Sequence, residues 1–230
     1  MLDHLGEKLI ARVSIGDFVV RFDLITIIMS WIVIAILVGL AFYLRRGLRQ
    51  NIEEKPNRIQ AVLDALIDVL QEQLLSNFIS TSLARRMFPF ISTLFLFVLV
   101  SNWLSVIPYL QSPTQNLNVT ASLALLVFFT SHLLALRRKG GRRFLKGFIE
   151  PYPFMLPINL VSELAKPVSH GFRLFGNIFG GTLLITVVSA MIPLVLPVGL
   201  TIFFGLFIGL IQAFVFAVLA VAYINLAVES

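Results

Sequence analysis

Hydrophobic residues are gathered into long runs along the chain instead of recurring at a helical or strand period. The first run, residues 24–44, carries no charge over about the length that crosses a bilayer core. Further runs cover about 88–110 and 118–136, and the last two, about 157–191 and 197–227, exceed one perpendicular crossing. The pattern predicts an all-α polytopic membrane protein with about five transmembrane helices, the last two long and strongly tilted.

The segment between the first two runs has a different pattern. Residues 57–82 place apolar side chains at helical spacing opposite Asp64, Asp68 and Glu72. This spacing predicts an amphipathic helix lying in the membrane interface, within residues 50–84. Residues 137–157 hold three glycines and three prolines, so we expect a broken, partly interfacial connection there.

Composition and charge agree with a membrane protein. The chain is 58% hydrophobic and 13% charged, whereas soluble domains carry roughly a quarter charged residues. The net charge of +6 comes from basic residues beside the apolar runs, at 45–49, 85–86 and 137–143. The positive-inside rule places these loops in the cytoplasm, so residues 1–23 lie outside and the C-terminus is cytoplasmic. We therefore expect no nucleic-acid partner.

One apolar helix carries a stripe of polar residues that falls in a sector roughly 80° wide. Its members are Asn159, Glu163, Lys166, His170, Arg173 and Asn177. Ionisable groups at membrane depth are costly unless they face protein or water, so the stripe predicts an ion path. The alternative is a buried polar seam in which Glu163 satisfies Lys166 and His170. Arg173 has no carboxylate among the four residues that follow it, so we expect its partner on another chain.

Small and polar residues near Arg173 suggest a helix contact. Gly176 and Gly180 stand at small-xxx-small spacing, which permits another helix to approach closely. Tight packing within the chain is the alternative explanation. In the final run, Gly205, Gln212 and Tyr223 project within about 20° of one another, which predicts a polar line that could face Arg173.

Four segments carry a resemblance to a known family. They are KPVSHGFRLFGN at 166–177, IQAFVFAVLAVAYI at 211–224, NVTASLAL at 118–125 and PFISTLFLFVLVSNWLSVIP at 89–108. Together they resemble subunit a of the membrane (Fo) sector of rotary F-type ATP synthase. The resemblance implies a non-catalytic stator in a bacterial plasma membrane, whose domain 85–230 passes H⁺ or Na⁺ through two aqueous half-channels. It further implies a rotor ring of c subunits, against which the last two helices tilt, and peripheral-stalk b subunits.

The resemblance also implies roles for individual residues. Arg173 takes the place of the essential stator arginine that faces the rotor carboxylates, with Asn177 and Gln212 as its polar neighbours. Polar positions near the half-channels correspond to Asn102, Ser105, Asn116, Ser122 and Glu163. We add His170 and Tyr223 as candidates from their positions, although His170 could equally be a hydrogen-bonded structural residue.

This chain departs from many relatives at four of the family's polar positions. Thr182 and Gly205 stand where glutamate and histidine are frequent, and Ser105 and Asn116 where aspartate is frequent. Three explanations stay open: water alone carries protons there, His170 or Glu163 takes over part of the relay, or the ion is Na⁺.

Two other function classes are weighed against this one. A secondary ion transporter would show broken helices in two corresponding halves, and an intramembrane enzyme would show a motif such as HExxH or GxSxG. The sequence has neither pattern and no cysteine. His4, His132 and His170 share no ligand spacing, so we expect no metal or cofactor, and His132 is predicted to be a packing or interfacial histidine.

Overall fold

The structure, a computed structural model, describes residues 10–15, 18–47, 58–107, 110–149, 152–192 and 195–229. Within these residues, five helical segments are long and apolar enough to cross a membrane. Four are the helices α1 (Leu24–Gly47), α3 (Thr81–Leu104), α4 (Leu117–Lys139) and α6 (Leu156–Met191). The fifth combines α7 (Val195–Ile202), a π-helical turn η5 (Phe203–Ile208) and α8 (Gly209–Glu229). The prediction of an all-α membrane domain with five spans is confirmed.

A two-stranded antiparallel hairpin precedes the first span and was not predicted. It consists of β1 (Ile10–Ile15) and β2 (Phe18–Asp23), with Val13 opposite Val20. Both strands are rich in β-branched or aromatic residues, which favour extended backbone. The hairpin leads directly into α1, where Asp23 accepts a hydrogen bond from the Thr26 hydroxyl at 3.0 Å and from the Thr26 amide at 3.4 Å.

An amphipathic helix lies between the first two spans. It comprises α2 (Arg58–Leu70) and a π-helical turn η2 (Gln71–Leu75), and its acidic residues Asp64, Asp68 and Glu72 are exposed. The second span, α3, begins at Thr81 and not near residue 88, because the Ser80 hydroxyl caps it by accepting from the Leu83 amide at 3.4 Å. Arg85 and Arg86, predicted to precede the span, therefore lie inside its N-terminal part.

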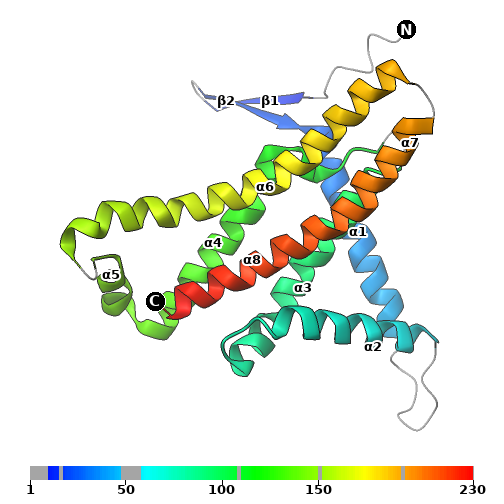
Figure 1. Ribbon diagram of the computed structural model, residues 1–230. Coiled ribbons are helices and arrows are strands. Elements are labelled where there is room, and N and C mark those ends of the chain that lie inside the picture. The colour runs from blue at the N-terminus through cyan, green and yellow to red at the C-terminus, as the bar shows by residue number, and fades with distance from the viewer. Residues whose placement is uncertain are drawn as a thin grey trace.

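The core is formed where α8 packs against α3 and α4, while α6 packs against α4. Ala213, Ala217 and Ala220 are fully buried along one face of α8, and these small side chains allow the neighbouring helices to approach closely. In Figure 1, α6 and α8 are the long diagonal helices and cross α3 and α4 obliquely.

The two ends of the molecule hold different elements (Figure 1). The hairpin, the 3₁₀ turn η3 (Pro113–Gln115) and the start of α7 form the hairpin end, where the Asn116 amide donates to the Thr26 hydroxyl at 3.1 Å. The amphipathic helix, α5 (Gly141–Ile149) and the end of α8 form the α5 end. There Lys139 donates to the carbonyl of Ala227 at 2.9 Å. The segment α5 with the turn η4 (Pro153–Met155) confirms the predicted broken connection.

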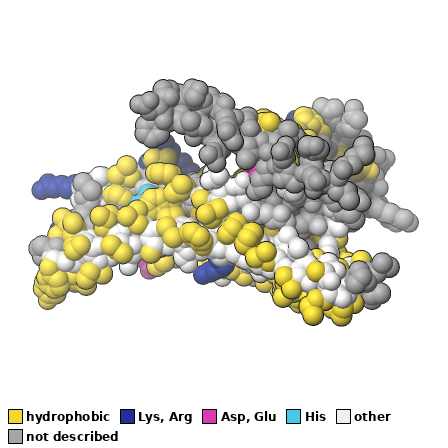
Figure 2. All heavy atoms as spheres, turned by 90° about the horizontal axis from the view of Figure 1, so that it is seen from above, with side chains coloured by type: hydrophobic (Ala, Val, Ile, Leu, Met, Phe, Trp, Pro, Cys, Tyr) yellow, Lys and Arg dark blue, Asp and Glu magenta, His cyan; other side chains and the backbone are white. Residues whose placement is uncertain are grey.

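Large apolar side chains cover much of the outer surface, as the yellow areas of Figure 2 show. Phe129 is 65% exposed and Met191 78% exposed. Among the described residues of α1, Val33 is the only buried one. Such a surface is stable against lipid tails and not against water, so the chain is an integral, multi-pass membrane protein.

Candidate functional site

Arg173 lies on an open face of α6. Its side chain is exposed, and within the described part of the chain it makes no hydrogen bond or ion pair. Gly176 and Gly180 share this face, and a Cβ added at either would meet no atom within 4 Å. For the described residues, the alternative that these glycines pack within the chain is therefore wrong. The face is bordered by exposed aromatic side chains, Phe172 and Phe179.

Asn177, one turn beyond Arg173, connects α6 to α8. Its side-chain amide donates to the Gln212 side-chain carbonyl at 3.4 Å, and Gln212 is buried. The predicted line of Gly205, Gln212 and Tyr223 is changed by the π-helical turn η5, which contains Gly205. Because a π turn is wider than an α turn, it breaks the regular rotation per residue on which that projection depended.

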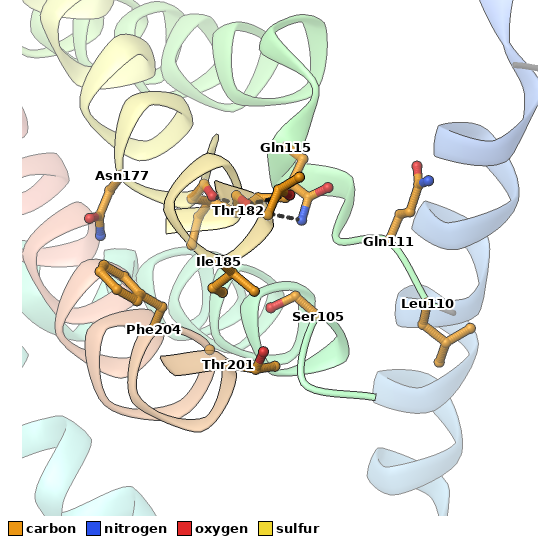
Figure 3. Close-up of a pocket in the computed structure, with 12 residues that line it drawn as sticks. Ser105, Leu110, Gln111, Gln115, Asn177, Thr182, Ile185, Thr201 and Phe204 are labelled. Atoms are coloured by element: carbon orange, nitrogen blue, oxygen red, sulfur yellow. Dashed lines mark hydrogen bonds between the residues drawn. The ribbon is translucent and has the colours of Figure 1, made fainter. Parts of the chain in front are cut away.

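A cavity of about 320 Å³ lies beyond Asn177, towards the hairpin end. We call it the neutral cavity; it is lined by Ser105, Leu110, Gln111, Gln115, Asn177, Ile178, Thr182, Ile185, Thr186, Thr201, Phe204 and Gly205. Figure 3 shows hydroxyl and amide side chains from several elements around it, with Gln115 donating to the Thr182 hydroxyl at 3.1 Å. None of these described lining side chains is ionisable, so they can hold water or a cation but offer no titratable relay.

Gly205 explains part of this neutral lining. A Cβ built there would lie 2.3 Å from Cγ2 of Val106 and 3.4 Å from the Ser105 hydroxyl. Val106 thus occupies the space that a larger residue at 205 would need. Val106, in the turn that follows α3, therefore fills the space beside Gly205.

A second, much smaller pocket lies on the other side of Arg173. We call it the ionisable pocket; its volume is about 10 Å³, and it is lined by Ala124, Phe128, Ser131, His132, Glu163, Lys166, Pro167, Tyr223 and Ala227. Glu163 forms an ion pair with Lys166 through Oε1, and its Oε2 lies 3.5 Å from Nε2 of His132. His132 was predicted to be a packing residue, and only the crossing of α4 and α6 reveals its contact with Glu163.

His170 lies between this pocket and Arg173 and is 1% exposed. Its ring stacks on Phe216, with centroids 3.8 Å apart, and meets the Tyr223 ring edge-on at 5.4 Å. Neither ring nitrogen has a hydrogen-bond partner among the described residues. The suggested satisfaction of His170 by Glu163 is therefore not seen, whereas the contact of Glu163 with Lys166 is.

The remaining predicted residues lie away from both spaces. Asn102 is buried, donating to the Gly209 carbonyl at 2.9 Å and accepting from the Thr114 hydroxyl at 2.8 Å. Ser122 is exposed and donates to the Asn118 carbonyl at 2.6 Å. Asn159 lies half-buried near the start of α6. Within the described residues no group of three His, Cys, Asp or Glu side chains is placed to hold a metal ion.

Comparison with known proteins assigns the chain to a family. The sequence profile described as ATP synthase A chain matches residues 27–225. ATP synthase subunit a of Acidothermus cellulolyticus is 37% identical over 209 residues, which is 86% of this chain and 74% of that protein. ATP synthase subunit a 1 of Crocosphaera subtropica is 40% identical over 199 residues, 86% of this chain and 84% of that protein. The chain therefore belongs to the ATP synthase A chain family, the family of subunit a, which is a non-catalytic membrane subunit of the ATP synthase complex.

Proposed function

We propose that this chain is the ion-translocating stator of an F-type ATP synthase, passing H⁺ or Na⁺ to and from the carboxylates of a rotor ring of c subunits. Peripheral-stalk b subunits and membrane lipid are its further proposed partners. One observation carries the proposal: Arg173 is exposed, has no partner within the described chain, and lies on α6 between the neutral cavity and the ionisable pocket.

The order of residues along α6 supports two separate half-channels. Glu163 and Lys166 of the ionisable pocket precede Arg173, and Asn177 and Thr182 of the neutral cavity follow it. At 1.5 Å rise per residue, Glu163 is about 15 Å and Thr182 about 14 Å from Arg173 along the axis. A permanent positive charge between the two spaces repels a cation that would pass directly from one to the other.

Electrostatics then couples ion flow to rotation. A charged carboxylate cannot enter lipid at low cost, whereas a neutralised one can, so ion uptake from one half-channel permits rotation. When the carboxylate returns to Arg173, the guanidinium favours the ionised form and drives release of the ion into the other half-channel. Arginine suits this role because it stays charged in proteins. The open face with Gly176 and Gly180 is where the ring helices would approach.

The orientation is part of the proposal. Arg137, Arg138 and Lys139 form the last turn of α4, and the exposed Arg85 and Arg86 lie near the start of α3. Both groups belong to the end of the molecule that carries α2 and α5 (Figure 1). The positive-inside rule makes this end cytoplasmic. The N-terminus and the neutral cavity are then outside a bacterial plasma membrane, and the C-terminus and the ionisable pocket are towards the cytoplasm.

Six residues are proposed for the ion path on this basis: Arg173, Asn177, Gln212, Glu163, His170 and Tyr223. Asn102 and Ser122, which the family resemblance also indicated, stay predictions. The hydrogen bonds of Asn102 to Gly209 and Thr114 favour a role in holding α3 against α8.

The test is ATP synthesis driven by a membrane potential in liposomes that hold the whole complex. Arg173→Ala is expected to abolish coupled synthesis, and Arg173→Lys is expected to retain little of it, because a lysine ammonium lacks the planar fork and loses its proton more readily. Varying Na⁺ at fixed pH in the unsubstituted complex identifies the ion. Unchanged coupled synthesis in Arg173→Ala would mean that this residue is structural and that the proposal is wrong.

A further inference from the structure

The contact between His132 and Glu163 joins two spans inside the membrane domain. His132 belongs to α4 and Glu163 to α6, and the two side chains are mostly buried, with 19% and 25% of their surfaces exposed. Their nearest atoms, Nε2 of His132 and Oε2 of Glu163, are 3.5 Å apart. No motif or spacing in the sequence connects them.

Hydrogen-bond chemistry determines which ring nitrogen of His132 carries a proton. Nδ1 lies 2.9 Å from the Phe128 carbonyl oxygen, which can only accept. The Ser131 hydroxyl, 3.3 Å from Nδ1, itself donates to the same carbonyl at 2.8 Å and so also offers an acceptor lone pair. Nδ1 is therefore the protonated nitrogen, and Nε2 is the one that faces the carboxyl group.

The facing atoms require one further proton. An unprotonated Nε2 opposite an ionised Oε2 would set two lone pairs against each other at reduced solvent exposure, which is unfavourable. One proton between them removes the conflict, either as imidazolium with carboxylate or as neutral imidazole with carboxylic acid. The pair can change between these forms by moving a single proton, with no change in its total charge.

Other groups around the pair connect it to Arg173. Lys166 from α6 pairs with the other oxygen of Glu163, and Tyr223 from α8 lines the same pocket. From α5, the Phe144 ring meets His132 edge-on at 5.8 Å. Tyr223 in turn contacts His170, whose ring nitrogens are buried without partners in the described chain. Titratable groups thus continue from the pair to the turn of α6 that precedes Arg173.

The size of the pocket limits what can pass. About 10 Å³ is close to the smallest volume that holds one water molecule. A hydrated Na⁺ needs several oxygen ligands and does not fit, whereas a proton can move along hydrogen bonds. The neutral cavity on the other side of Arg173 is about 320 Å³ and sets no such limit.

We propose that His132 and Glu163 form a shared-proton site on the cytoplasmic route, and that this route passes protons and not hydrated Na⁺. This inference rests on the proposed stator function and adds His132 as a proton-transfer residue. It explains how a proton can pass a pocket too small for a chain of water molecules, because fixed groups transfer the proton between them.

The experiment uses ATP-driven transport by the whole complex in liposomes, with a pH-sensitive dye and radioactive Na⁺ measured in parallel. His132→Gln and Glu163→Gln each introduce a polar side chain of similar length. The glutamine amide, however, neither takes up nor releases a proton near neutral pH. Because loss of a positioned proton-transfer group slows a step by roughly 100-fold or more, we expect each variant to lower proton uptake by at least about tenfold. The double variant is expected to be no slower than the slower single variant, since both remove the same step.

Controls separate this effect from misfolding. Leu133→Met changes an exposed neighbour of His132 on α4 and is expected to keep the rate of the unsubstituted complex. Copurification with the other subunits reports assembly of each variant. Where a variant does not assemble, solid-state ¹⁵N spectra of the unsubstituted complex, with histidine labelled in this chain alone, test the proton assignment directly. A protonated Nδ1 in His132 supports the proton assignment, and an unprotonated Nδ1 overturns the shared-proton site.

The remaining outcomes are equally decisive. Rapid proton uptake by His132→Gln, or Na⁺ uptake coupled to ATP hydrolysis in the unsubstituted complex, would overturn the shared-proton site. If at the same time Arg173→Ala abolishes coupling, the stator function stands and only this inference fails. If Arg173→Ala remains coupled, the stator function itself fails.

Discussion

At the scale of single residues, the surroundings of each glycine separate packed positions from open ones. A Cβ at Gly205 would come within 2.3 Å of Val106, whereas one at Gly199 would meet nothing within 4 Å. Both are glycines in the same apolar segment and the sequence does not distinguish them. The difference arises because η5, which contains Gly205, lies against the end of α3. Among the described residues, Gly199 in α7 has no neighbouring side chain at its Cβ position.

Gly205→Ala is expected to destabilise the chain, because overpacking a close contact costs about 1–3 kcal/mol. Gly199→Ala is the matched control and is expected to be neutral or to stabilise by up to about 1 kcal/mol, the helix-propensity gain over glycine. The thermal denaturation midpoint of the purified complex measures the stability change in each of the two variants. Adding Val106→Ala to Gly205→Ala should recover part of the loss, and equal midpoints for the two glycine variants would contradict the packing argument.

Asn102 and Ser122 form a second pair at this scale. Asn102→Ala removes a side-chain partner of the Gly209 carbonyl and one of the two side-chain partners of the Thr114 hydroxyl in a buried site, and unsatisfied buried groups cost about 1–3 kcal/mol. Ser122→Ala changes an exposed hydroxyl bonded to its own helix, so its effect should stay within about 0.5 kcal/mol. We expect a lower denaturation midpoint for Asn102→Ala alone; loss of ion transport without loss of stability would instead assign Asn102 to the ion path.

At the scale of elements, α6 has one packed face and one open face. Gly180 and Gly181 are adjacent, yet a Cβ at Gly181 would lie 2.9 Å from the Phe204 ring and one at Gly180 would meet nothing. The packed face carries His170, Leu174 and Ile178, all buried. The open face carries Arg173, so this open surface and the surface that holds the chain together are distinct.

Substitutions at Gly180 and Gly181 should therefore impair different properties of the protein. Gly180→Leu is expected to leave the stability of the membrane-inserted chain unchanged but to prevent close approach of a ring helix, so ATP synthesis and copurification with the ring fall. Gly181→Leu should lower the stability of the chain itself through its clash with Phe204. Resistance to limited proteolysis in membranes reports stability, and unimpaired ring assembly of Gly180→Leu would show that the ring does not use this face.

At the scale of the whole molecule, Arg173 separates two spaces of opposite character. The neutral cavity is the larger and is lined by hydroxyl and amide groups, and the ionisable pocket is much smaller and its lining includes titratable groups. The two spaces lie on opposite sides of Arg173 along α6, as the proposed pair of half-channels requires. The neutral cavity lies among α6, α7, η5, η3 and the turn after α3, and the ionisable pocket lies where α4, α6 and α8 meet.

Cysteine labelling can test this division, because the chain has no cysteine of its own. Thr186→Cys in the neutral cavity should react with a membrane-impermeant maleimide added outside, since reaction needs water and the thiolate form. Gln73→Cys, exposed in η2, should react only from the cytoplasmic side. Ile36→Cys, exposed to lipid on α1, is the unreactive control. Reaction of Thr186→Cys and Gln73→Cys from the same side would contradict the orientation.

Sequence alone was sufficient for the spans. In lipid, a long uncharged apolar run has few alternatives to a helix, so the runs predict the five spans directly. Helical periodicity places Glu163, His170, Arg173 and Asn177 within one sector of α6, but the packing of the bundle divides that sector, because His170 is buried and Arg173 is exposed. The start of α3 was misplaced because the cap at Ser80 is a local hydrogen bond that hydropathy does not register.

Only the tertiary structure decided which faces meet. The contact of His132 with Glu163, the packing of Val106 into the space beside Gly205 and the opposite surroundings of Gly180 and Gly181 all depend on how helices distant in sequence cross. The π turn η5 likewise alters the register of the last span, and a regular projection cannot foresee it. The physical reason is that periodicity specifies the direction of a side chain relative to its own helix axis, whereas the identity of its neighbour is set by packing of the whole bundle.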